Sequence, residues 1–452
     1  MLLDQGDFDA IKSLPSTCNL KVQKIILMTD KERNALISLP SGGLKEIGSG
    51  PKSILSGMVS DALALVRGRE LSLAAARFRI GNYEFRDPDY RQILIWAKAL
   101  VVTPENFIDR LQNYCEKDFK TGWPVDFEFS LEVEDGSIVS LVWNFDIFRI
   151  LSFEWVEGLR IKRIGFVGKA SAKVTLHLPL LDFLVCTSCG LTELDLSALP
   201  ALDRLQCDGN QLTKINLSTV PALTFLSCSD NQLVALDLSA VPALSLLQCA
   251  NNRLVKLDLS SVPALVVLSC FSNQLKKLDL LTVPELTRLW CSGNQLVELD
   301  LSMVPVLTAM SCFGNQLGKL NLLKVPELKE LRCSSNKLVR LDLSAVPALT
   351  VLSCYENQLG ELDLLKVPKL TELRCSGNKL YELDLSAVPA LTVLSCYENQ
   401  LGELDLLKVP KLKELWCWSN WFNQLDIRCL KELTGFECDI SVVLKRLSTQ
   451  NF

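Results

Sequence analysis

Residues 349–369 have the sequence Leu-Thr-Val-Leu-Ser-Cys-Tyr-Glu-Asn-Gln-Leu-Gly-Glu-Leu-Asp-Leu-Leu-Lys-Val-Pro-Lys, and this unit decides the fold. Related units precede and follow it. Thirteen cysteines stand 21 residues apart from Cys186 to Cys438, and asparagines follow three residues after the cysteines from Asn210 to Asn420. Self-similarity at such a short, fixed period predicts a solenoid in which each coil is one supersecondary unit.

Apolar side chains alternate around the cysteine of each unit. Leu352 and Cys354 project to the same side of an extended chain, which predicts a short strand. Four leucines complete the inward set: Leu349, Leu359, Leu362 and Leu364. A single coil cannot enclose this set, so the coils must stack to bury it. With parallel strands ~4.8 Å apart, twelve steps predict a ladder ~58 Å long.

The second half of the unit contains a Leu-Asp-Leu block that also alternates, at residues 362–364. This block leaves open a second ladder on the convex side of the solenoid. The Val-Pro pair that follows, at residues 367–368, predicts a turn because proline fixes φ and donates no hydrogen bond.

The unit resembles the leucine-rich repeat, whose pattern is L-x-x-L-x-(L/C)-x-x-N-x-L, and the match covers residues 181–438. The short period and the Leu-Asp-Leu block are similar to bacterial members of that family. The resemblance implies an α/β-type repeat solenoid, a curved array with a parallel β-ladder on its concave side. It also implies that this concave side binds a partner.

The array is expected to begin before the regular units. Leu141-x-Trp143 and Ile164-x-Phe166 precede Leu184-x-Cys186 at nearly the spacing of the regular units. Because the outer coils of a solenoid are usually atypical, residues 126–180 are interpreted as degenerate capping repeats. Residues 439–452 are the predicted C-terminal cap, with a short helix from Val442 to Leu447.

Residues 1–125 are predicted to form a small, mainly helical domain. Apolar spacing typical of helices occurs at Lys21–Leu39, Ile54–Val66 and Tyr90–Leu100. Thr103 followed by Pro104 predicts the start of a further helix that continues to about Phe119. This part of the chain resembles no family that we identify.

Composition limits the function classes. The net charge of −5 and the pI of about 5.3 provide no cationic surface for nucleic acid. No apolar run reaches the ~18 residues of a membrane helix, and no signal-peptide pattern opens the sequence. Most of the 17 cysteines share one interval, which favours a reducing compartment over a disulfide scaffold. We therefore expect a cytoplasmic protein, or one delivered to a host cytosol.

Few residues could support catalysis or bind a metal. The single histidine, His177, argues against a Ser–His–Asp triad or a histidine-based metal site. A straight row of thiols does not surround one point as a tetrahedral zinc site requires. Cys115, followed by Glu116, faintly resembles the cysteine motif of bacterial effector ubiquitin ligases that carry leucine-rich repeats. Their catalytic domain follows the repeats, whereas little follows them here. We expect no cofactor and no metal.

The candidate binding residues flank the cysteine on the face of each strand that points away from the core. Every second unit has an aromatic residue directly after the cysteine, and the alternate units have Trp or Arg directly before it. Trp, Tyr and Arg dominate protein interfaces, which favours partner binding over a self-supporting cation–π lattice. The predicted partner-binding residues are Phe271, Trp290, Phe313, Arg332, Tyr355, Arg374, Tyr397, Trp416 and Trp418.

Copying accounts for part of this alternation. Residues 341–370 are identical to residues 383–412, so the duplicated unit is a pair of coils.

Three functional hypotheses remain. The first is a non-enzymatic scaffold or adaptor that holds a protein partner on the concave side, with a second partner for residues 1–125. The second is an effector-type enzyme whose N-terminal domain is targeted by the repeats. The third is binding of a ligand or a single-stranded nucleic acid by stacking on the aromatic residues, against which the interleaved glutamates argue.

Overall fold

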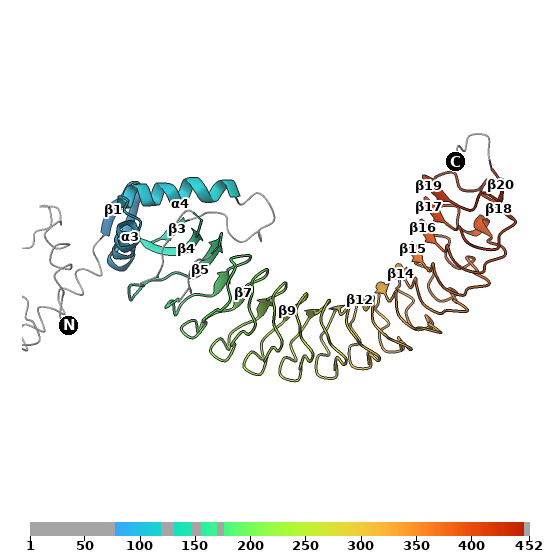
Figure 1. Cartoon of the computed structure of the whole chain (residues 1–452), viewed down its shortest axis with the longest axis horizontal. Coiled ribbons are helices and arrows are strands. Elements are labelled where there is room, and N and C mark those ends of the chain that lie inside the picture. The colour runs from blue at the N-terminus through green and yellow to red at the C-terminus, as the bar shows by residue number, and fades with distance from the viewer. Residues whose placement is uncertain (1–76, 119–130, 147–154, 170–175, 447–452) are drawn as a thin grey trace, which may run out of the picture. The chain divides into compact units, whose positions relative to one another are not determined.

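The computed structural model describes residues 77–118, 131–146, 155–169 and 176–446, and for 113–118 only the backbone. These residues belong to one compact unit, Arg77–Phe452. Its coils follow an arc with the strands on the inner side (Figure 1). The strands form one sheet of sixteen, in the order β19-β17-β16 and so on down to β3. The repeat strands are β6 (Phe183–Val185), β7 (Arg204–Gln206), β8 (Phe225–Ser227), β9 (Leu246–Gln248), β10 (Val267–Ser269), β11 (Arg288–Trp290), β12 (Ala309–Ser311), β13 (Glu330–Arg332), β14 (Val351–Ser353), β15 (Glu372–Arg374), β16 (Val393–Ser395), β17 (Glu414–Trp416) and β19 (Gly435–Glu437).

The register of the sheet follows the spacing of the sequence. Leu352 pairs with Leu373, which holds the same position in the next coil. Upstream, β4 (Ser137–Asn144) and β5 (Arg163–Val167) join the same sheet in parallel, with Leu141 opposite Ile164 and Ile164 opposite Leu184. These two segments thus continue the ladder at the positions that the sequence marked. In the described part of this sheet, only β3 (Leu131–Glu134) runs antiparallel to its neighbour, β4.

The core is a set of leucine and cysteine rows. Leu352, Leu359 and Cys354 have no exposed surface, and the equivalent residues of the neighbouring coils are buried in the same way. Each strand ends one residue before its cysteine, yet the ladder continues, because the Cys354 N–H donates to the Arg374 carbonyl at 2.8 Å. Burial raises the pKa of the ladder thiols, to about 12 for Cys312. The cysteines therefore act as small buried hydrophobic residues.

The asparagine row bonds each coil to the one before it. The Asn315 amide donates to the carbonyls of Cys291 at 3.1 Å and Cys312 at 3.0 Å, and its Oδ1 accepts the Leu296 N–H at 3.0 Å. The same set recurs from Asn210 to Asn420. These asparagines therefore satisfy backbone groups of two neighbouring coils. At position 189, where the row has cysteine, the thiol donates instead to the Phe166 and Thr187 carbonyls.

The Leu-Asp-Leu blocks do not form the second ladder of strands that the sequence left open. Leu362–Leu364 is irregular, and its aspartate caps the following turn, where Asp363 accepts the Leu365 N–H at 2.8 Å. Coil-to-coil bonds on this side come one segment earlier, as from the Gln358 N–H to the Leu338 carbonyl at 2.9 Å. In the last coils the block becomes strand β18 (Gln424–Asp426), which pairs with β20 (Val443–Lys445). One 3₁₀ turn, Leu406–Lys408, interrupts the irregular segments.

The C-terminal cap is a strand where the sequence predicted a helix from Val442. β20 lies parallel to β18, and Leu444 stands opposite Leu425. The prediction was wrong because the apolar spacing of so short a segment fits both structures, and the free edge of β18 supplies hydrogen-bonding partners that only a strand can use.

The start of the described unit holds a hairpin that the sequence analysis missed. β1 (Arg77–Ile80) and β2 (Tyr83–Arg86) pair across a two-residue Gly-Asn turn, in which Gly81 has φ +57°. Alternating residues around Gly-Asn are a hairpin signal. The helices α3 (Asp87–Ala99) and α4 (Pro104–Asp118) follow. The predicted start of α4 is confirmed, since Thr103 Oγ1 accepts the Asn106 N–H at 3.2 Å.

These helices cover the first coils instead of forming a separate body. Trp96 of α3, Phe107 of α4 and Trp143 of β4 form an aromatic cluster with ring centroids 5.3–5.9 Å apart. The buried Asp89 carboxylate accepts the Ile138 N–H at 2.9 Å, and its burial raises its pKa to about 6. These contacts join α3 and α4 to the first coils, and the boundaries at 125, 180 and 438 stay predictions.

The predicted helices Lys21–Leu39 and Ile54–Val66 lie outside the described residues. Among the helices that are described, none has the length and apolar character needed to cross a membrane.

Thiol labelling tests the burial of the cysteine row. In the native protein we expect a thiol reagent to leave the thirteen buried cysteines unmodified, because they are inaccessible and their pKa values are raised. Among the cysteines whose burial is described, Cys429 and Cys438, which are half-buried, should react first. Denaturation should expose all 17 thiols. Disulfides between ladder positions in a non-reducing peptide map would contradict the reduced row.

Replacement of one ladder asparagine tests the bonds between coils. Asn315→Ala strands the Leu296 N–H and two carbonyls in the core, so we expect a loss of about 3 kcal/mol in the free energy of unfolding. Urea denaturation followed by circular dichroism measures the change. Lys319→Ala in the same coil, an exchange at an exposed side chain, should change stability by less than about 0.5 kcal/mol.

Candidate functional site

Large and small side chains alternate in two columns on the open face of the sheet. The columns are the positions directly before and directly after each ladder cysteine. From Cys270 onward, a coil with serine before the cysteine has an aromatic residue after it, as in Ser353-Cys354-Tyr355. The next coil reverses the order, as in Arg374-Cys375-Ser376. The columns therefore form a checkerboard, which we call the aromatic face, made of the nine predicted residues Phe271, Trp290, Phe313, Arg332, Tyr355, Arg374, Tyr397, Trp416 and Trp418.

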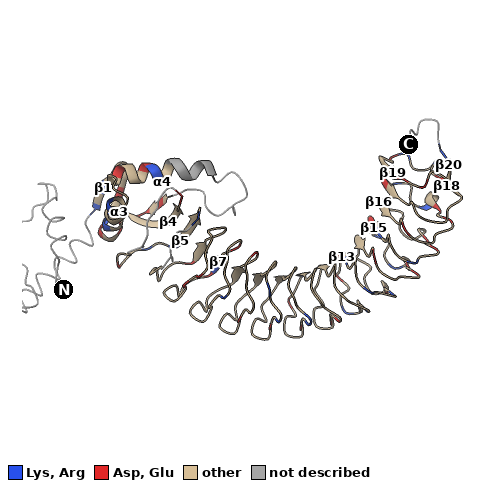
Figure 2. Cartoon of the chain, viewed as in Figure 1, with Lys and Arg blue, Asp and Glu red and all other residues tan. Residues whose placement is uncertain are grey.

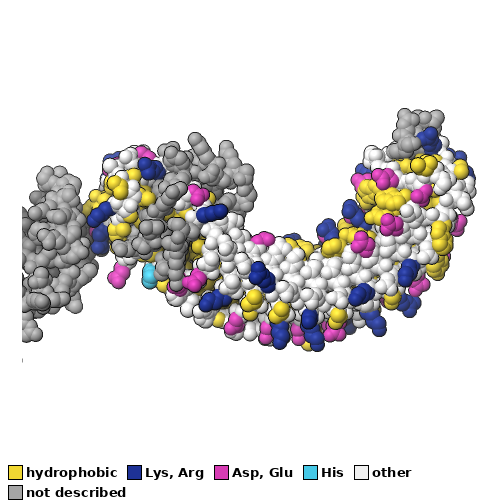
Figure 3. Space-filling model, viewed as in Figure 1, with side chains coloured by type: hydrophobic (Ala, Val, Ile, Leu, Met, Phe, Trp, Pro, Cys, Tyr) yellow, Lys and Arg dark blue, Asp and Glu magenta, His cyan; other side chains and the backbone are white. Residues whose placement is uncertain are grey.

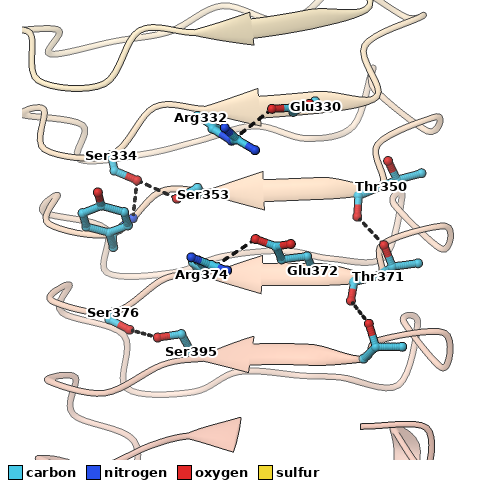
Figure 4. Close-up of polar contacts among 12 residues, drawn as sticks. Glu330, Arg332, Ser334, Thr350, Ser353, Thr371, Glu372, Arg374, Ser376 and Ser395 are labelled. Atoms are coloured by element: carbon cyan, nitrogen blue, oxygen red, sulfur yellow. Dashed lines mark hydrogen bonds and ion pairs between the residues drawn. The ribbon is translucent and has the colours of Figure 1, made fainter. Parts of the chain in front are cut away.

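The positions with small side chains are occupied by serines, and serines of adjacent coils are hydrogen-bonded in pairs. Ser376 Oγ and Ser395 Oγ are 2.7 Å apart, and Ser334 Oγ and Ser353 Oγ are 2.9 Å apart (Figure 4). Ser334 Oγ also accepts the Tyr355 N–H at 3.1 Å. All four serines are buried, so each pair makes a polar floor between larger neighbours.

The aromatic side chains lean on one another. Tyr397 and Trp418 stack with ring centroids 4.1 Å apart and planes 5° apart, and Phe313 and Tyr355 tilt together at 6.1 Å. Four of these side chains are half-buried, namely Tyr355, Tyr397, Trp416 and Trp418. Phe271 and Phe313 are 37% and 40% exposed. The side chains of the C-terminal coils therefore pack on one another on the open face. Their mutual contacts hold the rings in place before any ligand arrives.

The arginines of this face pair with glutamates, not with the rings. Arg332 Nε lies 3.0 Å from Glu330 Oε1, and Arg374 Nε lies 2.9 Å from Glu372 Oε1, each within one strand (Figure 4). The cation–π lattice that the sequence left as an alternative occurs elsewhere, where Arg204 lies between Phe183 and Phe225 at 5.0 and 5.4 Å. The guanidinium groups of the aromatic face are thus aligned by carboxylates.

A hollow of about 420 Å³ opens in the C-terminal part of the aromatic face. The Ser376–Ser395 pair lies at its floor. Its walls are five large side chains: Tyr355, Arg374, Tyr397, Trp416 and Trp418. Burial raises the pKa of Tyr355, with Glu356 and Tyr397 adding to the effect and Arg374 opposing it. The phenol hydroxyl of each tyrosine can donate a hydrogen bond.

Charges of both signs surround the hollow. Figure 3 shows hydrophobic, acidic and basic side chains side by side on the inner side of the C-terminal coils. Along the whole array, acidic and basic residues are interspersed (Figure 2). Glu356 and Glu398 are exposed, two residues after their ladder cysteines. They therefore place negative charge next to the tyrosines of the hollow, and the Glu356 carboxylate accepts a hydrogen bond from Ser335 Oγ of the preceding coil at 2.6 Å.

The N-terminal coils carry a polar network in the same columns. Ser227 Oγ donates to Asp208 Oδ1 at 2.6 Å and lies 2.9 Å from Gln248 Oε1. Burial raises the pKa of Asp208. Sequence reasoning missed this network and the Phe183–Arg204–Phe225 stack. A count of the column three residues before each cysteine would have found the stack.

The described residues give little support to a metal site or to a catalytic histidine or cysteine. Among the described residues, no group of three His, Cys, Asp or Glu side chains is placed to hold a metal ion. His177 is exposed. Cys115 lies on α4, in the part whose side chains are outside the described set.

Solved structures similar to this one are leucine-rich-repeat proteins. The functional domain of InlJ from Listeria monocytogenes, which includes a cysteine ladder, is 31% identical with a TM-score of 0.63 and covers 68% of each chain. The Leptospira interrogans protein LIC12759 is 24% identical, with a TM-score of 0.60 over 68% of this chain and 84% of its own. YopM from Yersinia enterocolitica is 27% identical, with a TM-score of 0.54 over 66% and 68%.

The chain belongs to the leucine-rich-repeat family, as the sequence pattern indicated. No family model matches it, and no curated protein is similar enough to count as a relative.

A double-mutant cycle tests the packing of the aromatic face. Tyr397→Ala and Trp418→Ala should show a coupling energy of about 1 kcal/mol in urea denaturation, because the two rings stack. The pair Phe271→Ala and Trp418→Ala is the matched control, since seven coils separate these residues, and its effects should be additive. Additive effects in the first pair would show that the stack contributes nothing to stability.

Proposed function

We propose that the protein is a non-enzymatic scaffold or adaptor that holds a protein partner on the aromatic face. The observation that carries this proposal is the hollow, with its walls of Tyr, Trp and Arg. These residue types supply most of the energy at protein interfaces, especially where they line well-packed pockets. The rings and guanidinium groups are already fixed by stacks and ion pairs, so binding would order few side chains.

The mixed charge of the face favours a protein over a nucleic acid. Bases could stack on Tyr397 or Trp418, but Glu356 and Glu398 stand on the same rim and would repel phosphates. An enzymatic role would need a reactive group. The ladder thiols are buried with raised pKa values, which is the opposite of an activated nucleophile. Unpaired thiols in such number fit a reducing compartment, and we propose a cytoplasmic location.

A triple substitution tests the proposal. We expect the affinity for the partner to fall about a hundredfold or more when three residues are changed together, in the variant Tyr355→Ser, Tyr397→Ser and Trp416→Ser. Each tenfold loss of affinity corresponds to about 1.4 kcal/mol. The partner is isolated by affinity purification from the native host with the unaltered protein, and its affinity for both forms is measured by titration calorimetry. Circular dichroism must show that the variant keeps its fold, because these rings also pack on one another.

The control lies on the other side of the solenoid. Lys366→Ser and Lys369→Ser change two exposed convex residues and should leave affinity unchanged. Loss of binding in this pair, with binding retained in the triple variant, would move the binding site to the convex side.

A further inference from the structure

We propose that the hollow between Tyr355 and Tyr397 binds a proline-rich segment in the polyproline II conformation, with a basic residue beside it. This inference rests on the proposed function and deepens it, because it names the backbone conformation and the charge of the partner segment. It follows from three features of the aromatic face: its period, its chemistry and the charge of its rim.

The period of the aromatic column is close to the repeat of a polyproline II helix. Tyr355 and Tyr397 belong to alternate coils, so their backbones are ~9.6 Å apart at ~4.8 Å per coil. A polyproline II helix presents one side chain to the same side every three residues, which is ~9.3 Å at ~3.1 Å per residue. A β-strand repeats its face every ~6.7 Å, and an α-helix every ~5.4 Å.

The spacing between successive aromatic rings of the column decides where a ligand can enter. Phe313 and Tyr355, two coils apart, approach each other to 6.1 Å between ring centroids, whereas Tyr397 stacks on Trp418 of the next coil at 4.1 Å. The two tyrosines thus part on either side of the Ser376–Ser395 floor, and the hollow of about 420 Å³ lies between them. This volume falls within the ~300–1,000 Å³ of ordinary ligand pockets.

The chemistry of the walls suits proline rings and free carbonyls. Flat Tyr and Trp rings offer apolar surface to a rigid pyrrolidine, which has little conformational entropy left to lose. A polyproline II segment has no internal hydrogen bonds, so its carbonyls need donors from the protein. Within the described part of the chain, the hydroxyls of Tyr355 and Tyr397 and the indole N–H of Trp416 donate no hydrogen bond, which leaves them as donors for a ligand.

The acidic rim selects the charge of the segment. Glu356 and Glu398 follow the two tyrosines directly and are exposed, and the charge of Glu356 acts on Tyr355 even though its carboxylate accepts a hydrogen bond from Ser335 Oγ at 2.6 Å. Arg374 forms an ion pair with Glu372, so its positive charge is largely balanced by that carboxylate. A lysine or arginine next to the prolines would meet these carboxylates, whereas an acidic segment would be repelled.

The test uses the full chain and a synthetic peptide, decaproline with an arginine at each end. We expect calorimetry to detect binding that weakens with added salt, because the arginines meet the acidic rim. A glycine-serine peptide of equal length, with the same two arginines, should bind at least tenfold more weakly, because it has no preformed helix. Decaproline with a glutamate at each end should also bind at least tenfold more weakly than the arginine-flanked peptide.

A variant that fills the hollow locates the site. Ser376→Tyr puts at the floor the side chain that the neighbouring coils carry in the same column, and circular dichroism must show that the variant keeps its fold, because Ser376 is buried. It should weaken the arginine-flanked decaproline at least tenfold. Ser292→Tyr, the same exchange in the same column four coils before Ser376, is the matched control and should leave that affinity unchanged.

Three results would overturn the proposal. The glycine-serine peptide could bind as tightly as the proline peptide, or Ser376→Tyr could leave the affinity for the proline peptide unchanged. The proline peptide could also fail to bind while an oligosaccharide or a single-stranded oligonucleotide binds the hollow. The two proposals can fail separately. A native partner that the triple variant loses, but that the proline peptide does not displace, would retain the scaffold function and reject the polyproline II segment.

Discussion

Each coil is held to the next by the buried asparagine, and the rest of the structure depends on this contact. The amide of Asn357 spans the carbonyls of two coils, while its oxygen holds the N–H of Leu338. A buried polar backbone group without such a partner would cost about 1–3 kcal/mol. The side chain therefore fixes both the turn after the cysteine and the distance to the previous coil. Repeated along the array, it holds the strand columns in register.

Because the register is constant, side chains at the same position of successive or alternate coils become neighbours in space. This turns a duplication in the chain into a pattern on a surface. The pair of coils repeated at 341–370 and 383–412 places aromatic residues and serines at alternate positions of two columns. Large groups then stand beside small ones, and a hollow forms where two serines meet. The site is thus a property of the stack, since no single coil contains it.

The ends of the array show how the structure deals with open edges. At the start, α3 and α4 cover the first coils through the cluster around Trp96, and β3 reverses direction beside β4. At the other end, β20 adds to β18 and extends the irregular side into a short sheet. Both devices protect edges that would otherwise offer unpaired backbone groups to other chains.

The sequence by itself determined the period, the inward rows and the register, because a fixed spacing of Leu, Cys and Asn leaves one way to stack the coils. It also indicated which side chains share the open face, since alternation along a strand decides that. Tertiary structure decided how those side chains meet. The lean of Tyr397 toward Trp418, the bond between Ser376 and Ser395, and the pairing of Arg374 with Glu372 join neighbours in space whose preferred partners the sequence left open. The strand at Val443 and the hairpin at Arg77 likewise depended on competing local signals and on the edges available to them, which short segments do not reveal.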